Sequence, residues 1–234
     1  MRSTRKILIV VTSTARMDTT GEPTGLWLEE LATPYYAFVD AGLAVTLASI
    51  RGGTAPIDPR SVRAKGENPA SVERFLGDEA ASAALSSTAS VEAVDASAHQ
   101  ALFLPGGHGT MWDLPGSPAL ARAVSTVWAS GGVVAAVCHG PAGLLDAQDV
   151  TGAPLVARRR MTAFSNSEER AAGLAEAMPF LLETRLRELG GRYDAGRDFQ
   201  PFAIADGRLV TGQNPASSAR TAELMLDALR VAAR

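Results

Sequence analysis

The sequence has little cysteine and little histidine, with one cysteine and three histidines in 234 residues. A single cysteine cannot form an internal disulfide, and none of the paired Cys/His spacings of zinc sites occurs, so we expect no metal and no other cofactor. A long hydrophobic run is also missing, because the N-terminal apolar stretch covers only Ile7 to Val11. That stretch is too short for a signal peptide or a membrane span, which favours a reducing, cytoplasmic setting without a membrane partner.

The sequence also lacks an excess of positive charge. Its net charge is -3, and the one dense basic run, Arg158 to Arg160, is typical of an exposed strand edge or turn. No broad basic surface for nucleic acid is therefore expected. Hydrophobic residues make up 46% of the chain, which is enough for a full core, and no stretch has the composition of a linker. We predict a single domain over residues 1–234.

Apolar runs alternate with helical patterns along the chain. The runs of strand length are unbroken, as expected for strands that are buried on both faces; they are Lys6–Thr12, Leu43–Ile50, Ala101–Leu104 and Val133–Val137. Amphipathic helical patterns lie at Leu26–Ala41 and Pro118–Ser130. This alternation predicts βαβ crossovers and a mostly parallel sheet with helices on both faces.

The segment from Arg51 to Ala98 is too long for the single helix and two loops of a simple crossover. We expect an insertion here, built as a small helical cap with short helices at Pro69–Phe75 and Asp78–Leu85. Further on, Asp206-Gly207 separates two apolar runs and predicts a hairpin turn with positive φ at both residues. A last amphipathic helix is predicted from about Pro215 to Val231.

The only cysteine lies in the stretch GGVVAAVCHGPAGLL, where a buried strand ends and a helix is predicted to begin at Gly140-Pro141. Ligands of an open α/β sheet bind at this edge, beyond the carboxyl ends of the strands. The positive end of the helix dipole would favour the thiolate of Cys138 and lower its pKa from about 8.5 towards neutrality. The backbone N–H of His139 would point at the atom that Cys138 attacks.

A lone cysteine at a strand end is more often a small apolar core residue than a nucleophile. Two neighbouring features favour the nucleophile. His139 follows the cysteine directly, and the preceding strand ends in LPGGHGT, where Gly106 and Gly107 allow close approach to a ligand and leave N–H groups free to hold an oxyanion. The same loop lacks the Lys-Ser/Thr pair of a phosphate-binding P-loop. We therefore predict that Cys138 is a nucleophile.

Five motifs carry a resemblance to a known family. They are TGLWLEE, PGGHGT, AVCHGP, TAFSNSEE and LVTGQNPASS, in this order and spread over nearly the whole chain. The sequence resembles the ThiJ/PfpI superfamily, which has a class I glutamine amidotransferase-like fold, and within it the branch of heat-shock chaperones and glyoxalase III enzymes. The resemblance implies a flavodoxin-like α/β fold: a three-layer α/β/α sandwich with a mostly parallel central sheet, a nucleophile elbow and a small helical cap.

The resemblance also implies a set of catalytic residues. Cys138 matches the nucleophile of the family, and His139 matches the histidine that follows it. The third member of the triad matches Glu169, although Glu168 beside it would take that place after a shift of one residue. The glutamate near the cysteine matches Glu30 in TGLWLEE, and it would either accept a proton from the cysteine or stay protonated and donate to it.

The oxyanion site of the family matches Gly107 together with the N–H of His139. His108, in the same loop, would be either a substrate-binding residue or a structural donor. We expect Trp27 and Trp112 to pack against the core rather than to line the pocket.

These residues imply a cofactor-free lyase of the glyoxalase III type. Cys138 would add to the aldehyde of methylglyoxal, or of a related 2-oxoaldehyde, to form a hemithioacetal. Proton transfer and hydrolysis would then release a 2-hydroxy acid such as lactate. The relatives also imply a homodimer and a role in stress protection or deglycation.

Two other functions stay open for the sequence alone. A cysteine-dependent amidase or peptidase of the PfpI type would use the same thiol and oxyanion site. A holdase chaperone would need an exposed apolar patch rather than an active site. A glutamine amidotransferase is disfavoured, because its catalytic histidine lies far downstream of the cysteine and no histidine follows His139 here.

Overall fold

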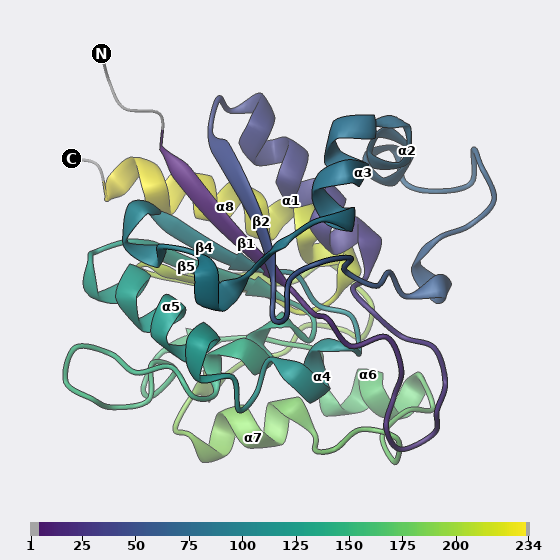
Figure 1. Cartoon of the computed structure of the whole chain (residues 1–234). Helices are drawn as coiled ribbons and strands as arrows, with labels where there is room; N and C mark the ends of the chain where they lie inside the picture. Colours follow the sequence, from purple (N-terminus) through teal and green to yellow (C-terminus); the bar gives the residue numbers. More distant parts are fainter. Residues whose placement is uncertain (1–4, 233–234) are drawn as a thin grey trace.

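A seven-stranded sheet forms the middle layer of the structure, in the order β3-β2-β1-β4-β5-β9-β8 (Figure 1). The computed structural model describes residues 5–232, so the domain predicted over residues 1–234 includes ends that lie outside that range. All neighbouring strands of the sheet are parallel except β8 and β9. The strands are β1 (Lys6–Val11), β2 (Ala44–Ser49), β3 (Ala89–Ser90), β4 (Ala101–Leu104), β5 (Val133–Val137), β8 (Ala203–Asp206) and β9 (Leu209–Gly212).

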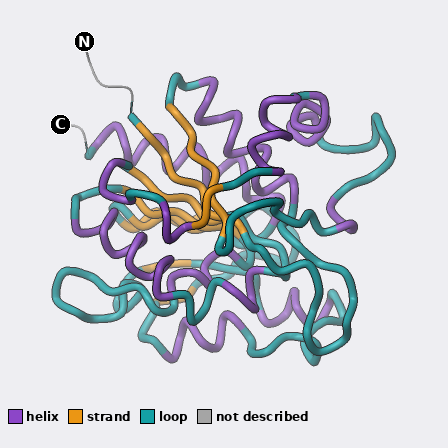
Figure 2. The backbone as a smooth tube through the Cα atoms, viewed as in Figure 1, coloured by secondary structure: helices purple, strands orange, loops and turns teal. Residues whose placement is uncertain are grey.

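Helices cover both faces of the sheet. Helices α1 and α8 pack together on one face, and α5 packs on the other (Figures 1 and 2). The helices are α1 (Leu28–Asp40), α2 (Ala70–Gly77), α3 (Glu79–Ser86), α4 (Thr110–Asp113), α5 (Pro118–Ala129), α6 (Asn166–Ala171), α7 (Leu182–Glu188) and α8 (Ser218–Val231). A separate two-stranded sheet pairs β6 (Arg160–Met161) with β7 (Arg192–Tyr193). The predicted three-layer α/β/α architecture is confirmed.

Alternate residues of the central strands enter two hydrophobic cores. In β1, Ile7 and Ile9 pack with side chains of α1 and α8, whereas Leu8 and Val10 pack with side chains of α5. All four residues are fully buried. Burial on both faces removes the need for polar positions, which is why these strands are unbroken apolar runs in the sequence.

The β8–β9 hairpin forms as predicted, but its turn lies one residue later. Asp206 is still part of β8 and pairs with Leu209, so the central residues of the turn are Gly207 and Arg208. Gly207 has a φ of 60°, whereas Asp206 is not among the described residues with positive φ. The prediction of positive φ at Asp206 is wrong because the strand ladder continues through that residue.

The segment between residues 51 and 98 packs beside the sheet. Its helix α2 packs against α1, and α3 packs against α2 (Figure 1). Arg74 of α2 forms an ion pair of 2.7 Å with Asp40 of α1. The short strand β3 extends the sheet at the β2 edge. A 3₁₀ turn at Pro59–Ser61, within this segment, carries Arg60 towards the carboxyl ends of the strands.

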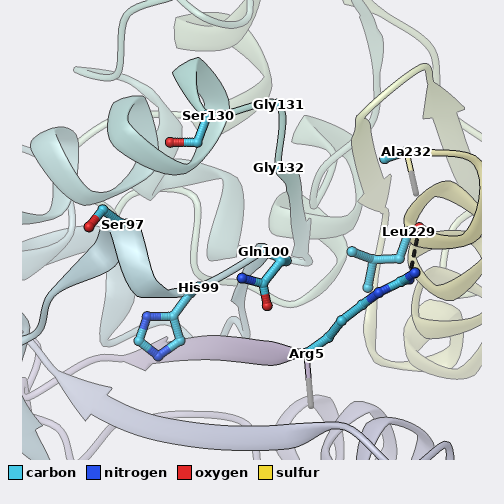
Figure 3. Close-up of a pocket in the computed structure, with 9 residues that line it drawn as sticks. All are labelled: Arg5, Ser97, His99, Gln100, Ser130, Gly131, Gly132, Leu229 and Ala232. Carbon is cyan, nitrogen blue, oxygen red and sulfur yellow. Dashed lines mark hydrogen bonds between the residues drawn. The ribbon is translucent and has the colours of Figure 1, made fainter. Parts of the chain in front are cut away.

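Two cavities of about 310 Å³ each lie at opposite ends of the parallel strands. The cavity at the amino ends is shown in Figure 3, where the Arg5 guanidinium donates a hydrogen bond of 3.0 Å to the Leu229 carbonyl. Among residues 5–232, those that line it include no thiol and no carboxylate. The cavity at the carboxyl ends holds Cys138, so chemistry rather than size distinguishes the two.

Of the helices in residues 5–232, none combines the length and the apolar composition that crossing a membrane would require.

Candidate active site

Cys138 occupies a sharp turn at the end of β5. Its φ is 58°, which is unfavourable for a residue with a side chain and persists only where the surroundings hold it. Two backbone hydrogen bonds of 2.9 Å hold it here: the Cys138 N–H donates to the Gly212 carbonyl, and the Phe164 N–H donates to the Cys138 carbonyl. Neighbouring segments on both sides therefore fix the direction of the Sγ atom.

The resting form of Cys138 differs from the thiolate that we predicted. The chain after Cys138 forms a short 3₁₀ turn, Gly140–Leu144, and not the α-helix whose dipole would lower the pKa. Burial is the main cause that raises the pKa of Cys138 well above its usual value. The N–H groups of Gly107 and His139 act in the opposite direction but do not outweigh burial. The structure therefore favours the thiol.

Glu30 lies in the first turn of α1 and is fully buried beside the cysteine. Its Oε2 accepts a hydrogen bond of 2.7 Å from the Gly106 N–H, whereas its Oε1 has no hydrogen-bond partner. Burial raises the pKa of Glu30 well above its usual value, and the nearby Cys138 thiol and the hydrogen bond from the Gly106 N–H only partly oppose this. A buried, protonated carboxyl is thus poised next to the thiol.

The loop after β4 brings backbone N–H groups up to the cysteine. A side chain is excluded at Gly106, because a Cβ there would lie 2.6 Å from Glu30 Oε2 and 2.7 Å from the His139 nitrogen. Gly107 has a φ of 102°, and a Cβ on it would lie 2.5 Å from the Trp27 nitrogen. These two glycines let the loop pack between α1 and the cysteine turn, which places the Gly107 N–H at the thiol.

His139 lies between Cys138 and Glu169. Its Nδ1 is 3.2 Å from the Cys138 Sγ, and its Nε2 is 2.7 Å from Glu169 Oε2. Burial alone would raise the pKa of Glu169, but its contacts with His139 and His108 outweigh burial and lower the pKa. Glu169 is therefore a carboxylate that accepts from Nε2–H of His139, which assigns Nδ1 as the nitrogen that can take a proton from the thiol.

Glu168 serves a different purpose from its neighbour Glu169. Its Oε2 accepts hydrogen bonds of 3.0 Å from the N–H and the hydroxyl of Ser165, which closes a capping box at the start of α6. Its Oε1 accepts from the Phe199 N–H and the Asn214 amide, each at 2.8 Å. Adjacent residues on a helix point about 100° apart, so only one of the two glutamates can reach His139.

His108 contacts the second oxygen of Glu169. Its Nε2 is 3.0 Å from Glu169 Oε1, and Arg60 Nη2 lies 3.4 Å from its Nδ1. Because the guanidinium can only donate, Nδ1 accepts and Nε2 carries the proton that Glu169 receives. Burial, together with the neighbouring His139, lowers the pKa of His108 to about 4, so the ring is neutral near pH 7. His108 thus lines the cavity and also donates to the triad carboxylate.

A metal ion would compete with this arrangement. His108, His139 and Glu169 offer three ligand atoms within 4.8 Å of one another. Each Glu169 oxygen is already hydrogen-bonded to a histidine nitrogen, at 2.7 and 3.0 Å. Coordination would require both rings to give up the protons that make these contacts. The donor set therefore fits a proton-sharing cluster better than a resident metal.

The structure brings all of the predicted site residues together, from Glu30 on α1 to Glu169 on α6. Two cavity residues that sequence reasoning missed are Arg60 and Phe199, and no local pattern in the sequence marks either one. The prediction that Trp27 packs against the core rather than lining the pocket is wrong, because Trp27 is only partly buried and lines the cavity. Trp112 packs against the α5 side of the core, as predicted.

Known proteins resemble this chain over nearly its full length. It is 33% identical over 236 residues to glutathione-independent glyoxalase HSP31 of Saccharomyces cerevisiae, covering 97% of this chain and 98% of that protein. The structure of Rapid Encystment Protein 24 KDa of Francisella tularensis superposes with a TM-score of 0.91 at 35% identity, covering 96% and 99% of the two chains. Glyoxalase III from Candida albicans superposes with a TM-score of 0.88 at 30% identity, covering 96% and 97%. Residues 24–228 match the model of the DJ-1/PfpI family, and the chain belongs to that family.

Proposed function

We propose that this protein is a glutathione-independent glyoxalase, which converts methylglyoxal and related 2-oxoaldehydes to 2-hydroxy acids such as lactate. The observation that carries the proposal is the contact of 3.2 Å between the Cys138 Sγ and the His139 Nδ1, beside the buried Glu30 carboxyl and facing a cavity. The similar proteins of S. cerevisiae and C. albicans are named glyoxalases, which supports the same chemistry here.

The first step joins the sulfur of Cys138 to the aldehyde carbon. The thiol proton passes to Nδ1 of His139, and the sulfur electron pair forms the S–C bond as the C=O π bond opens. The N–H groups of Gly107 and His139 stabilise the oxyanion that develops there. The oxyanion then takes the proton back from His139, which leaves a neutral hemithioacetal.

The second step moves a proton between the two carbons. Neutral His139 removes the hydrogen of the first carbon as a proton, while the oxygen of the second carbon takes a proton from Glu30 to give an enediol. His139 then protonates the second carbon, and the hydroxyl of the first carbon returns its proton to Glu30. The product is a thioester of Cys138, and water hydrolyses it to the 2-hydroxy acid and the free thiol.

His108 is a positioning residue in this scheme, because it acts through Glu169. His108→Ala is expected to lower kcat/KM for methylglyoxal by about tenfold, since a buried carboxylate oxygen without its donor costs about 1–3 kcal/mol and can turn away from His139. His108→Gln, whose amide N–H can donate to the same oxygen, is expected to recover most of the loss in kcat. Steady-state kinetics of the two variants test the assignment, and equal losses in both would contradict it.

The proposed function is tested by adding methylglyoxal to the purified protein in buffer that contains a chelator and no glutathione. We expect lactate to form and the chelator to leave the rate unchanged. Release of dye from chromogenic amides and peptides, without lactate, would instead assign a PfpI-type hydrolase. Protection of a client protein from aggregation, without either reaction, would assign a holdase.

Three further features belong to this proposal. We propose that the chain is a single domain with residues 51–98 as an insertion, that two copies form a homodimer, and that the protein works in the cytoplasm. The free thiol of Cys138 must stay reduced for the chemistry above, which supports a reducing compartment. Sedimentation analysis of the purified protein tests the dimer.

A further inference from the structure

The outer part of the active-site cavity is apolar and is not used by the chemistry of the aldehyde. Six residues form this apolar wall: Trp27, Phe164, Ala172, Leu174, Phe199 and Pro215. The whole cavity measures about 310 Å³. Pockets that bury a drug-sized ligand begin at about 300 Å³, so methylglyoxal, with a single methyl substituent, leaves most of this space unfilled.

Phe199 is the most exposed aromatic member of the apolar wall. Its side chain is 48% exposed, and within residues 5–232 it is the only aromatic among the large exposed hydrophobic residues. Its φ is 58°, a conformation that a bulky side chain keeps only where other contacts fix it. Both the positive φ and the exposure of an apolar ring to water cost free energy. Their combination at one residue points to a binding role for the ring.

A buried carboxylate holds Phe199 in this conformation. The Phe199 N–H donates a hydrogen bond of 2.8 Å to Oε1 of Glu168, which is fully buried. Asn214 donates to the same oxygen, and Ser165 donates to the other. The backbone of Phe199 is therefore tied to the start of α6, one residue before the triad carboxylate Glu169.

One other ring, that of Phe164, connects the ring of Phe199 to the ring of His139. Its centroid is 6.2 Å from the ring of Phe164, whose centroid is 4.5 Å from the ring of His139. A substrate bound to Cys138 through its aldehyde carbon would therefore place its other substituent along these rings.

The charged residue of the rim does not favour an anionic substituent. Arg60 Nε and Nη2 are 2.9 and 2.6 Å from the two carboxylate oxygens of Asp58. This bidentate pair already compensates the guanidinium charge. Apolar contact is then the main attraction that the cavity offers to a substituent.

We propose that Phe199 is a specificity-determining residue, and that the preferred substrates are 2-oxoaldehydes whose substituent is apolar and larger than methyl, such as isobutyl or phenyl. The inference rests on the proposed glyoxalase function and narrows its substrate class. Each added methylene in an apolar pocket changes kcat/KM by roughly tenfold or more, so a cavity of this kind discriminates between methyl and isobutyl.

The test compares kcat/KM for methylglyoxal, isobutylglyoxal and phenylglyoxal. In the wild type, we expect both larger substrates to exceed methylglyoxal by about tenfold or more. The ratio of kcat/KM for a larger substrate to kcat/KM for methylglyoxal is expected to fall by about tenfold in Phe199→Ala. It should fall by less in Phe199→Leu, which keeps apolar area at the same place. Leu76→Ala is the matched control, because Leu76 is also an exposed apolar residue, at 45%, but lies on α2 outside the cavity. It should leave the ratio unchanged.

The outcomes separate this inference from the proposed function. Turnover of methylglyoxal with an equal ratio in the wild type and Phe199→Ala would overturn the role of Phe199 and leave the glyoxalase intact. A change of oligomeric state in Phe199→Ala without a change of ratio would overturn it in favour of a contact between copies. No turnover of any of the three aldehydes by the wild type would overturn both.

Discussion

Cys138→Ala is expected to lower kcat/KM for methylglyoxal by roughly 10⁴-fold or more, because it removes the one atom that bonds to the substrate. The chain contains no other thiol that could replace it. The backbone hydrogen bonds of Cys138 to Gly212 and Phe164 do not involve the side chain, so the turn should persist in the variant. Lactate formation over time, at matched concentrations of variant and wild type, measures the loss.

The folded state of Cys138→Ala provides the control. The substitution removes a single small atom from a site that is 4% exposed, so the melting temperature should stay close to that of the wild type. Lactate formation at the wild-type rate by this folded variant would contradict the proposed nucleophile. Client protection that survives while lactate formation is lost would show a separate holdase activity.

Glu30→Gln is expected to lower kcat/KM by about 10²- to 10⁴-fold, because an amide cannot pass a proton to and from the substrate oxygens. Glutamine has nearly the same shape as the protonated carboxyl, and its amide oxygen can still accept from the Gly106 N–H, as Oε2 of Glu30 does at 2.7 Å. The loss should therefore fall on kcat and not on folding. Activity equal to the wild type would contradict a proton-transfer role for Glu30.

Glu30→Gln is also expected to raise the thermal stability of the protein. Burial raises the pKa of Glu30 above its ordinary value of 4.5, so the folded protein keeps a proton that the unfolded chain releases. The wild type therefore loses stability as the pH rises above that value, whereas Glu30→Gln has no such proton to lose. Its melting temperature should exceed that of the wild type by a margin that grows as the pH rises above about 5, until the pH reaches the raised pKa of Glu30. Glu169, whose pKa is lowered, has the opposite pH dependence, but it is present in both proteins and cancels in the difference.

The parts of the site that lie on short, continuous stretches could be predicted from the sequence. The apolar run of β5 ends at Cys138, and glycines surround the strand ends because a Cβ at Gly106 would touch both Glu30 and the cysteine turn. Such constraints act within a few residues and leave a local pattern. The resemblance to the ThiJ/PfpI superfamily then supplied Glu30 and the pair Glu168/Glu169, which no local pattern marks.

The parts that depend on contacts between distant segments could not be predicted. Arg60 reaches His108 from 48 positions away, and Phe199 is held by Glu168 from 31 positions away. The protonation state predicted for Cys138 is also wrong, because burial outweighs the effect of a helix end that is only a short 3₁₀ turn. Neither burial depth nor the neighbours in space can be read from the order of residues.

In the proposed mechanism, Cys138 turns over 2-oxoaldehydes rather than merely trapping them. The most direct measurement is the amount of lactate formed per methylglyoxal consumed, with excess substrate and without added thiol. We predict one lactate for each methylglyoxal, over many turnovers for each Cys138, and none with Cys138→Ala. Consumption of methylglyoxal that stops after about one equivalent of protein, with no lactate, would contradict the account and leave only a reactive thiol.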